Sequence, residues 1–204
     1  MTKTVIGTYT NMEDAIDVVN KLVEAGFQRN SISLIANDPD KQYAGYVDGG
    51  MDDTAKGAGI GAAIGGLGGL LLGLGALAIP GIGPVIAAGP LAAALAGAGI
   101  GAVTGGIIGA LIDLGVPEES ANMYAESVRR GNALVAAQVA DNRVDEATRI
   151  MQHAGLIDIE REATGWRASG WNRFDENAPV VDTTVDRQRM SKGASGMTTR
   201  RDDL

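Results

Sequence analysis

The residues able to perform chemistry are few in this chain, and none forms a pattern typical of catalysis. There is one histidine, His153, and no cysteine, so disulfide bonds and thiolate metal sites are excluded. His153 falls in the last turn of a predicted helix, where a cation suits the helix dipole, and we interpret it as a surface residue. No serine forms a recognisable nucleophile motif with a histidine or lysine. We therefore predict that the protein is not an enzyme.

A group of carboxylates before the middle of the chain could attract a hard cation. Its members are Asp38, Asp40, Asp48, Asp52 and Asp53. They lack both the Asp-x-Asp-x-Asp-Gly spacing and the terminal glutamate of an EF-hand loop. We therefore predict a solvated acidic linker, bounded at residues 41–56, and neither a metal nor a cofactor.

The central stretch, residues 57–112, contains no charged residue and lies between Lys56 and Asp113. Its first glycines superficially match a dinucleotide-binding loop, but no predicted strand ends immediately before Gly57, so that interpretation is rejected. Small residues instead recur at every fourth position in two runs, which lets two helix backbones approach closely. These ridge residues are Gly57, Gly61, Gly65, Gly69 and Gly73, followed by Ala93, Gly97, Gly101, Gly105 and Gly109.

The two ridges predict a glycine-zipper hairpin of two apolar helices, residues 57–78 and 91–112, which reverses at Ile79–Pro84. Each helix would contain about 22 residues and extend about 33 Å, close to the roughly 30 Å thickness of a bilayer core. Bulky residues such as Leu70 and Ile107 lie opposite the ridges and are predicted to face lipid or other subunits. Three interpretations stay open: a membrane-inserted hairpin, a buried oligomerisation hairpin, and a flexible glycine-rich segment.

Composition limits the partners that the chain can have. The 204 residues carry a net charge of −8, which argues against a nucleic-acid-binding surface. The first residues, Met1–Ile6, lack the basic and apolar regions of a secretory signal. With an even number of spans, we expect membrane association with both termini cytoplasmic; the alternative is a cytoplasmic protein.

The residues before the linker predict a βαβ unit. Thr4–Thr10 is β-branched and aromatic, and Asn11 is a good N-cap for a helix over Met12–Ala25. Gly26 stands where a left-handed residue ends a helix, and Ser31–Ala36 alternates like a second strand.

A second βαβ unit follows the apolar stretch, after a helix that begins at Pro117. Asn132–Val139 is the predicted strand, Asp141 caps a helix that ends at Gly155, and Leu156–Glu162 alternates like another strand. Two such halves predict an α+β fold with a ferredoxin-like, split βαβ sheet, interrupted by the hairpin.

The remaining residues, from Ala163 on, show no periodic apolar face and predict a disordered tail. For Trp166 and Trp171 we favour packing back on the sheet over contact with a membrane or partner. The predicted divisions are 1–40 (first βαβ half), 41–56 (linker), 57–112 (hairpin), 113–162 (helix and second βαβ half) and 163–204 (tail).

Several of these motifs together resemble bacterial general stress proteins that have a heat-induced-stress-protein-type N-terminal domain. The resemblance extends over about Thr4 to Glu162, and the residues that carry it are Val5–Tyr9, Glu13–Ala15, Ala25–Phe27, Ile32–Ile35, and the glycine-zipper hairpin followed by Gly115–Pro117. It implies a bacterial, stress-linked protein and supplies no catalytic residues. The tail lies outside it.

These observations predict a non-enzymatic, stress-related protein: an α/β module that the hairpin tethers to, or embeds in, a membrane, and that self-associates. One alternative is a soluble homo-oligomer whose hairpins form a shared apolar core. Another is a small-ligand-binding α/β domain with the hairpin as a dimer arm. The partners expected are therefore membrane lipid or further copies of the chain, and not nucleic acid.

Overall fold

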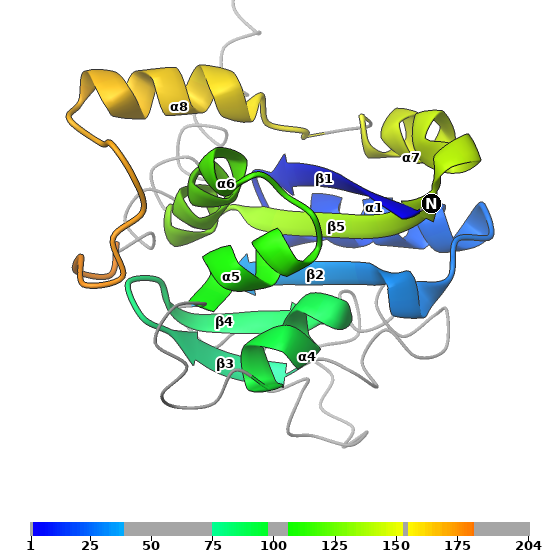
Figure 1. The fold of residues 1–204 in the computed structure, drawn as a ribbon, viewed down its shortest axis with the longest axis horizontal. Helices are drawn as coiled ribbons and strands as arrows, with labels where there is room; N and C mark the ends of the chain where they lie inside the picture. Colours follow the sequence, from blue (N-terminus) through cyan, green and yellow to red (C-terminus); the bar gives the residue numbers. More distant parts are fainter. Residues whose placement is uncertain (1, 39–74, 98–105, 153–154, 182–204) are drawn as a thin grey trace, which may run out of the picture.

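A computed structural model describes residues 2–38, 75–97, 106–152 and 155–181 (Figure 1). The strands are β1 (Thr2–Tyr9), β2 (Ile32–Asn37), β3 (Gly75–Ile79), β4 (Gly83–Ala88) and β5 (Ala133–Ala140). The helices are α1 (Met12–Glu24), α4 (Pro90–Gly97), α5 (Gly106–Asp113), α6 (Glu118–Arg129), α7 (Val144–Met151) and α8 (Ile159–Ala168), with short 3-10 turns η1 (Arg29–Ser31) and η3 (Asp141–Arg143).

The strands form one five-stranded sheet in the order β1-β5-β2-β4-β3, and every neighbouring pair is antiparallel. Strands β1 and β2, which α1 connects, belong to the first predicted half, and β5 belongs to the second. Because β5 lies between β1 and β2, strands of the two halves alternate in the sheet. The predicted α+β class is confirmed. Strands β3 and β4 extend the sheet beyond β2; β3 replaces the end of the first predicted helical arm, and β4 lies between the two predicted arms.

Each face of the sheet has its own apolar core, because side chains alternate between faces along a strand. Leu34 and Val135 face α1 and α7, whereas Ile35 and Leu134, their neighbours in sequence, face α4, α5 and α6. Figure 1 shows α4, α5 and α6 in front of the sheet and α1 behind it. The domain is therefore a three-layer arrangement of helix, sheet and helix.

The predicted start and end of α1 are confirmed. The Asn11 side-chain oxygen accepts a hydrogen bond from the backbone N–H of Asp14 at 2.8 Å, as expected of an N-cap. Gly26 has a φ of 83°, the left-handed conformation that favours glycine after a helix. The strands β1, β2 and β5, and helix α6 after Pro117, also lie within a few residues of their predicted positions.

The predicted strand at Leu156–Glu162 is wrong. Only Leu156 forms a bridge, to Tyr9 on the outer edge of β1, and the Ile157 N–H donates to the Thr8 carbonyl at 2.8 Å. Helix α8 begins directly afterwards, because the Asp158 side chain caps it by accepting from the Arg161 N–H. An acidic N-cap with glutamates in the first turn outweighs a short apolar alternation.

The first arm of the predicted helical hairpin is wrong in its described part, because residues 75–79 form strand β3 and not a helix. The chain does reverse near Pro80, but the segments on either side are strands β3 and β4, with Leu77 and Val85 on the same face of the sheet. The physical reason is a tight turn with glycines at positive φ, Gly81 at 74° and Gly83 at 95°, followed by Pro84, which a helix interior disfavours. In the described ranges, no helix has the length and apolar character required to cross a membrane.

The second predicted arm is helical in its described parts, α4 and α5, but these helices cover the chain's own sheet. Helices α4 and α5 pack against one another and over the sheet, and residues 98–105 between them lie outside the described ranges. Ile107, predicted to face lipid or another subunit, is fully buried with Ile35 and Leu134. The chain's own sheet supplies an apolar surface for this side chain, so no lipid is needed to cover it.

Gly89 allows the turn from β4 into α4 to pass close to β2. Its φ is 77°, and a Cβ atom at this position would lie 2.1 Å from the carbonyl oxygen of Ile32. Two residues later the Leu91 N–H donates to the buried hydroxyl of Ser33 at 3.1 Å. Strand β2 therefore supplies the cap for the first turn of α4.

The disordered tail predicted from Ala163 is wrong as far as residue 181. Helix α8 buries Ala163 and Trp166 against Met123 of α6, and the following segment buries Phe174 in the second core. The predicted inward packing of the tryptophans is therefore right for Trp166, although its partner is a helix and not the sheet. Residues 182–204 lie outside the described ranges.

Candidate functional site

Most of the predicted ridge lies outside the described residues: Gly57, Gly61, Gly65, Gly69, Gly73, Gly101 and Gly105. Of the other members, Ala93 and Gly97 belong to α4 and Gly109 belongs to α5. The small-residue spacing in these two helices accompanies their packing on each other. The close contact predicted between the two ridges themselves stays a prediction.

Of the residues considered for metal chemistry, the structure describes only Asp38. Asp38 is 3 % exposed at the end of β2, and its N–H donates to the Pro84 carbonyl at 2.9 Å. The other carboxylates of this group, Asp40, Asp48, Asp52 and Asp53, lie outside the described residues, as does His153. Across the described ranges, no three histidine or acidic side chains are grouped so that they could hold a metal ion.

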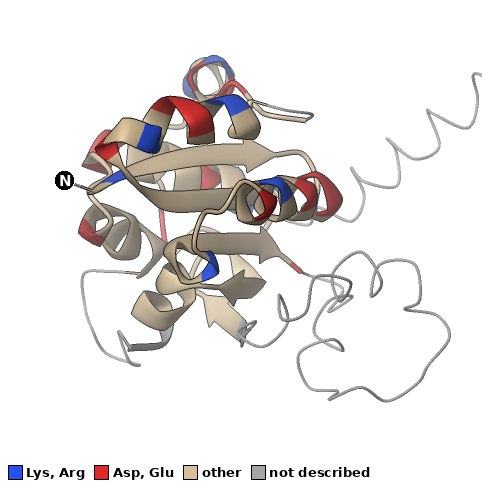
Figure 2. Cartoon of the chain, turned by 90° about the vertical axis from the view of Figure 1, so that its right-hand side faces the viewer, with Lys and Arg blue, Asp and Glu red and all other residues tan. Residues whose placement is uncertain are grey.

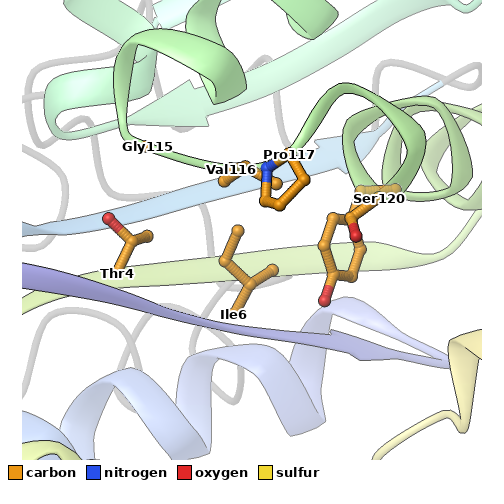
Figure 3. A pocket seen from close by; sticks show the side chains of 7 residues that line it. Thr4, Ile6, Gly115, Val116, Pro117 and Ser120 are labelled. Atoms are coloured by element: carbon orange, nitrogen blue, oxygen red, sulfur yellow. The ribbon is translucent and has the colours of Figure 1, made fainter.

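A hollow lies between β1 and the loop that joins α5 to α6 (Figure 3). Its volume is about 150 Å³, and its walls are Thr4, Ile6, Gly115, Val116, Pro117, Ser120 and Tyr124. Thr4 and Ile6 point from β1 toward the loop that carries Val116 and Pro117 (Figure 3). Pro117 was predicted to begin a helix and Gly115–Pro117 carries part of the family resemblance, but nothing in the spacing of these residues indicates a pocket.

The hollow offers hydroxyl groups and apolar surface. The Thr4 hydroxyl donates to the backbone carbonyl of Leu114, which holds the loop against β1. Burial raises the pKa of the Tyr124 phenol above its ordinary value, and the negative charge of Glu160 raises it further. The phenol is therefore protonated at neutral pH and can donate a hydrogen bond.

These wall residues do not provide the groups that catalysis requires. Ser120 is the only alcohol besides Thr4, and no histidine, lysine or carboxylate among the wall residues could activate either as a nucleophile. The volume is also small, since ligand pockets typically measure roughly 300–1,000 Å³. A cavity of about this size holds a single small ring such as benzene. The hollow suits a small neutral group and not a nucleotide or other large cofactor.

Charge is distributed very unevenly over the described structure. Residues 75–97 and 106–112, which form β3, β4, α4 and α5, contain no Asp, Glu, Lys or Arg before Asp113. We call this part the uncharged half. Figure 2 shows acidic and basic residues concentrated on helices in the upper part of the view, above strands and a helix that are almost entirely tan. The exposed or partly exposed side chains of the uncharged half, including Ala78, Leu95 and Ile112, are apolar.

The C-terminal segment is fastened to α6 by an acidic side chain that is almost completely buried. The Glu126 carboxylate accepts from Nε of Arg129 at 2.9 Å and from Nε of Arg130 at 2.7 Å. Arg130 lies over the ring of Trp166, 4.8 Å from its centre, and Arg129 also donates to the Pro179 carbonyl at 3.1 Å. One carboxylate thus orients two cations that each contact the C-terminal segment.

Sequence analysis missed this arrangement, which we call the Glu126 cluster (Glu126, Arg129, Arg130 and Trp166). A signal was present, because Glu126 precedes Arg129 and Arg130 by three and four residues, the spacing of helical ion pairs. Ile159, Ala163 and Trp166 likewise recur at helical spacing. The cluster fixes α8 and the residues after it to the domain, which is a structural role and not a catalytic one.

Comparison with protein-family models, with curated proteins and with solved structures finds no significant match for this chain. The resemblance to bacterial general stress proteins therefore stays a prediction.

Proposed function

We propose that the protein is a non-enzymatic self-association module, in which the charged helices form the outer surface and the uncharged half is the contact between copies. The observation that carries this proposal is the separation of charge: all described residues of β3, β4 and α4 are uncharged, in a chain whose net charge is −8. Copies that repel each other elsewhere can approach through a surface without charge.

The described path of the chain argues for self-association over a membrane-spanning hairpin. Asp38 follows β2 and Gly75 begins β3, and both strands belong to the same sheet. Asp38 and Gly75 therefore lie on the same side of any bilayer, so a membrane-spanning hairpin between them would need an even number of spans. The described residues on either side of 98–105 likewise lie together, because α4 and α5 pack on the same face of this sheet.

An even number of spans does not fit the sequence between Asp38 and Gly75. The uncharged run 57–74 contains about 18 residues, so each of two helical arms would extend only about 13 Å of the roughly 30 Å required. A single span would instead force residues 39–56, with Asp48 and Asp52 among them, back through the hydrocarbon. Self-association requires neither.

The finer fold and the biological setting are part of the same proposal. We propose that β1, α1, β2, β5 and α7 are a ferredoxin-like arrangement in which the last strand is reduced to the bridge at Leu156. The strands and helices between β2 and β5 would then be an insertion that carries the contact surface. A stress-related role rests on the sequence resemblance alone.

The mass of the full-length chain in solution tests the proposal. Light scattering across a range of protein concentrations should give a mass that rises above the 20.9 kDa of one chain. A mass that stays at one chain up to the highest concentration reached would contradict self-association. Fractionation of expressing cells with an alkaline wash tests the competing prediction, because retention in the washed membrane pellet would support a membrane-embedded protein.

A further inference from the structure

The two edges of the sheet differ in how they are protected from pairing with another strand. At the β1 edge, Leu156 forms a β-bridge with Tyr9, and the Ile157 N–H donates to the Thr8 carbonyl. Lys3 at the same edge pairs with Asp141 at 3.3 Å. Within the described residues β3 pairs only with β4, and Gly75–Ile79 has neither a charge nor a proline. Lysines, prolines and covering segments are the usual means of protecting an edge, and among the described residues no lysine or proline lies in β3 and no second strand pairs with it.

The register identifies the backbone groups that β3 presents to its open side. The Pro84 carbonyl accepts from Asp38, so the backbone of Pro84 faces β2 and that of its neighbour Val85 faces β3. Leu77 is opposite Val85, so the backbone groups of Leu77 face inward. Successive residues alternate along a strand, and the N–H and C=O groups of Ala76 and Ala78 therefore point outward.

We propose that two copies of the chain join by antiparallel pairing of their β3 edges about a two-fold axis at Leu77. This inference rests on the proposed self-association and names the surface responsible. With Leu77 on the axis, Ala76 of one copy lies opposite Ala78 of the other. Each pair exchanges both backbone hydrogen bonds, which gives about four in total and one continuous sheet twice as wide.

A second copy fits this edge better than a partner of different chemistry. A two-fold contact places the same strand on both sides, so an uncharged strand meets an uncharged strand and no like charges oppose each other at the axis. Elsewhere the two copies, each with a net charge of −8, repel. The exposed Ala78 side chain is small and allows the backbones to approach to strand spacing.

A proline at Ala78 tests the outward hydrogen bonds in the full-length chain. Ala78→Pro removes an outward N–H and leaves the pairing of β3 with β4 intact, since Ala78 donates nothing to β4. We expect the dissociation constant of the dimer to rise at least about tenfold, measured by sedimentation equilibrium. The matched control is Thr2→Pro, which removes an outward N–H at the opposite edge and should leave association unchanged.

Cysteine cross-linking tests the register and does not depend on the proline variant folding. The chain has no cysteine, so a single Leu77→Cys substitution gives one thiol per copy, on the predicted axis. Oxidation should produce a disulfide-linked dimer, because residues opposite each other across antiparallel strands lie about 4.5–5.5 Å apart. Ile79→Cys is the control: its two copies would be separated by about 14 Å along the strands, beyond the reach of a disulfide.

The outcomes separate this inference from the proposed function. A wild-type chain that is monomeric at every concentration overturns both. Wild-type association that Ala78→Pro leaves unchanged, together with no cross-link at Leu77→Cys, overturns the β3 edge and retains self-association. A fall in the free energy of unfolding of Ala78→Pro with no change in its association would also overturn the inference, because the outward N–H of Ala78 would then serve the fold of a single chain and not a contact between copies.

Discussion

The charged and uncharged halves of the molecule are stabilised by different kinds of contact. Helices α1 and α8 begin with side-chain caps, and α6 is tied to the C-terminal segment through the Glu126 cluster. The uncharged half has no ion pairs of its own, and its described helices rely on burial of residues such as Leu91 and Leu111. The comparison indicates that ion pairs and side-chain caps hold elements in place in the charged half, whereas the uncharged half depends mainly on apolar packing, with the Ser33 hydroxyl as a cap for α4.

Removal of the C-terminal segment should have the largest effect, because that segment packs on both halves. Truncation after Glu162 deletes Ala163, Trp166 and Phe174, all of which are buried. Loss of one large aromatic from a core typically costs about 3–5 kcal/mol, so we expect most of the domain's stability to be lost. Urea unfolding followed by far-UV circular dichroism measures this.

Trp166→Ala and Phe174→Ala, made singly, divide the effect between the two halves, since Trp166 packs on α6 and Phe174 on the second core. An unchanged unfolding midpoint in the truncated chain would show that the segment from 163 to 181 does not complete the core.

The same comparison explains which parts of the fold could be predicted from the sequence. In α1, buried residues such as Ile16 and Val19 alternate with exposed charges at helical spacing, and both the type and the ends of the element are predicted correctly. In residues 75–88, nearly every position is apolar or glycine, so a helical and an extended period cannot be distinguished. Small residues that recur at every fourth position favoured a helix. The glycines at positive φ, Gly81 and Gly83, instead allow a tight turn between two strands.

The candidate site was less predictable than the fold. The hollow brings Thr4 beside Ser120 and Tyr124, which are more than a hundred residues away in sequence, and only the pairing of β1 with β5 and the packing of α6 place them together. The Glu126 cluster could be predicted in part, because its ion pairs join residues only three and four positions apart in the sequence. The buried position of Glu126 could not, since it depends on how the residues after α8 return to α6.

Truncation of Ile107 tests whether the uncharged half is a core of this chain or a surface that requires lipid. Ile107 is fully buried, so Ile107→Ala should lower the free energy of unfolding by about 2–4 kcal/mol through loss of apolar burial and creation of a cavity. The conservative Ile107→Val should cost less than about 1.5 kcal/mol. Chemical denaturation of the purified full-length chain in detergent-free buffer provides the measurement. Equal stability of wild type and Ile107→Ala would contradict the packing of α5 on the sheet.

The smallest of the three effects should come from Glu126→Gln, which sharpens the contrast by weakening a polar contact in the charged half. The Glu126 side chain is 1 % exposed, and glutamine keeps its shape while removing the charge that two arginines share. Breaking a fully buried ion pair costs about 3–5 kcal/mol, but Arg129 and Arg130 are 14 % and 34 % exposed and can regain water. We therefore expect a loss of about 2 kcal/mol in the free energy of unfolding.

Glu119→Gln is the matched control, because Glu119 pairs with Arg167 at 3.2 Å while 81 % exposed, and such surface pairs contribute little. The fluorescence of Trp166 adds a local readout, since release of Arg130 from the ring should move its emission before the domain unfolds. Identical stability and emission for Glu126→Gln and Glu119→Gln would show that apolar packing holds the charged half together as well.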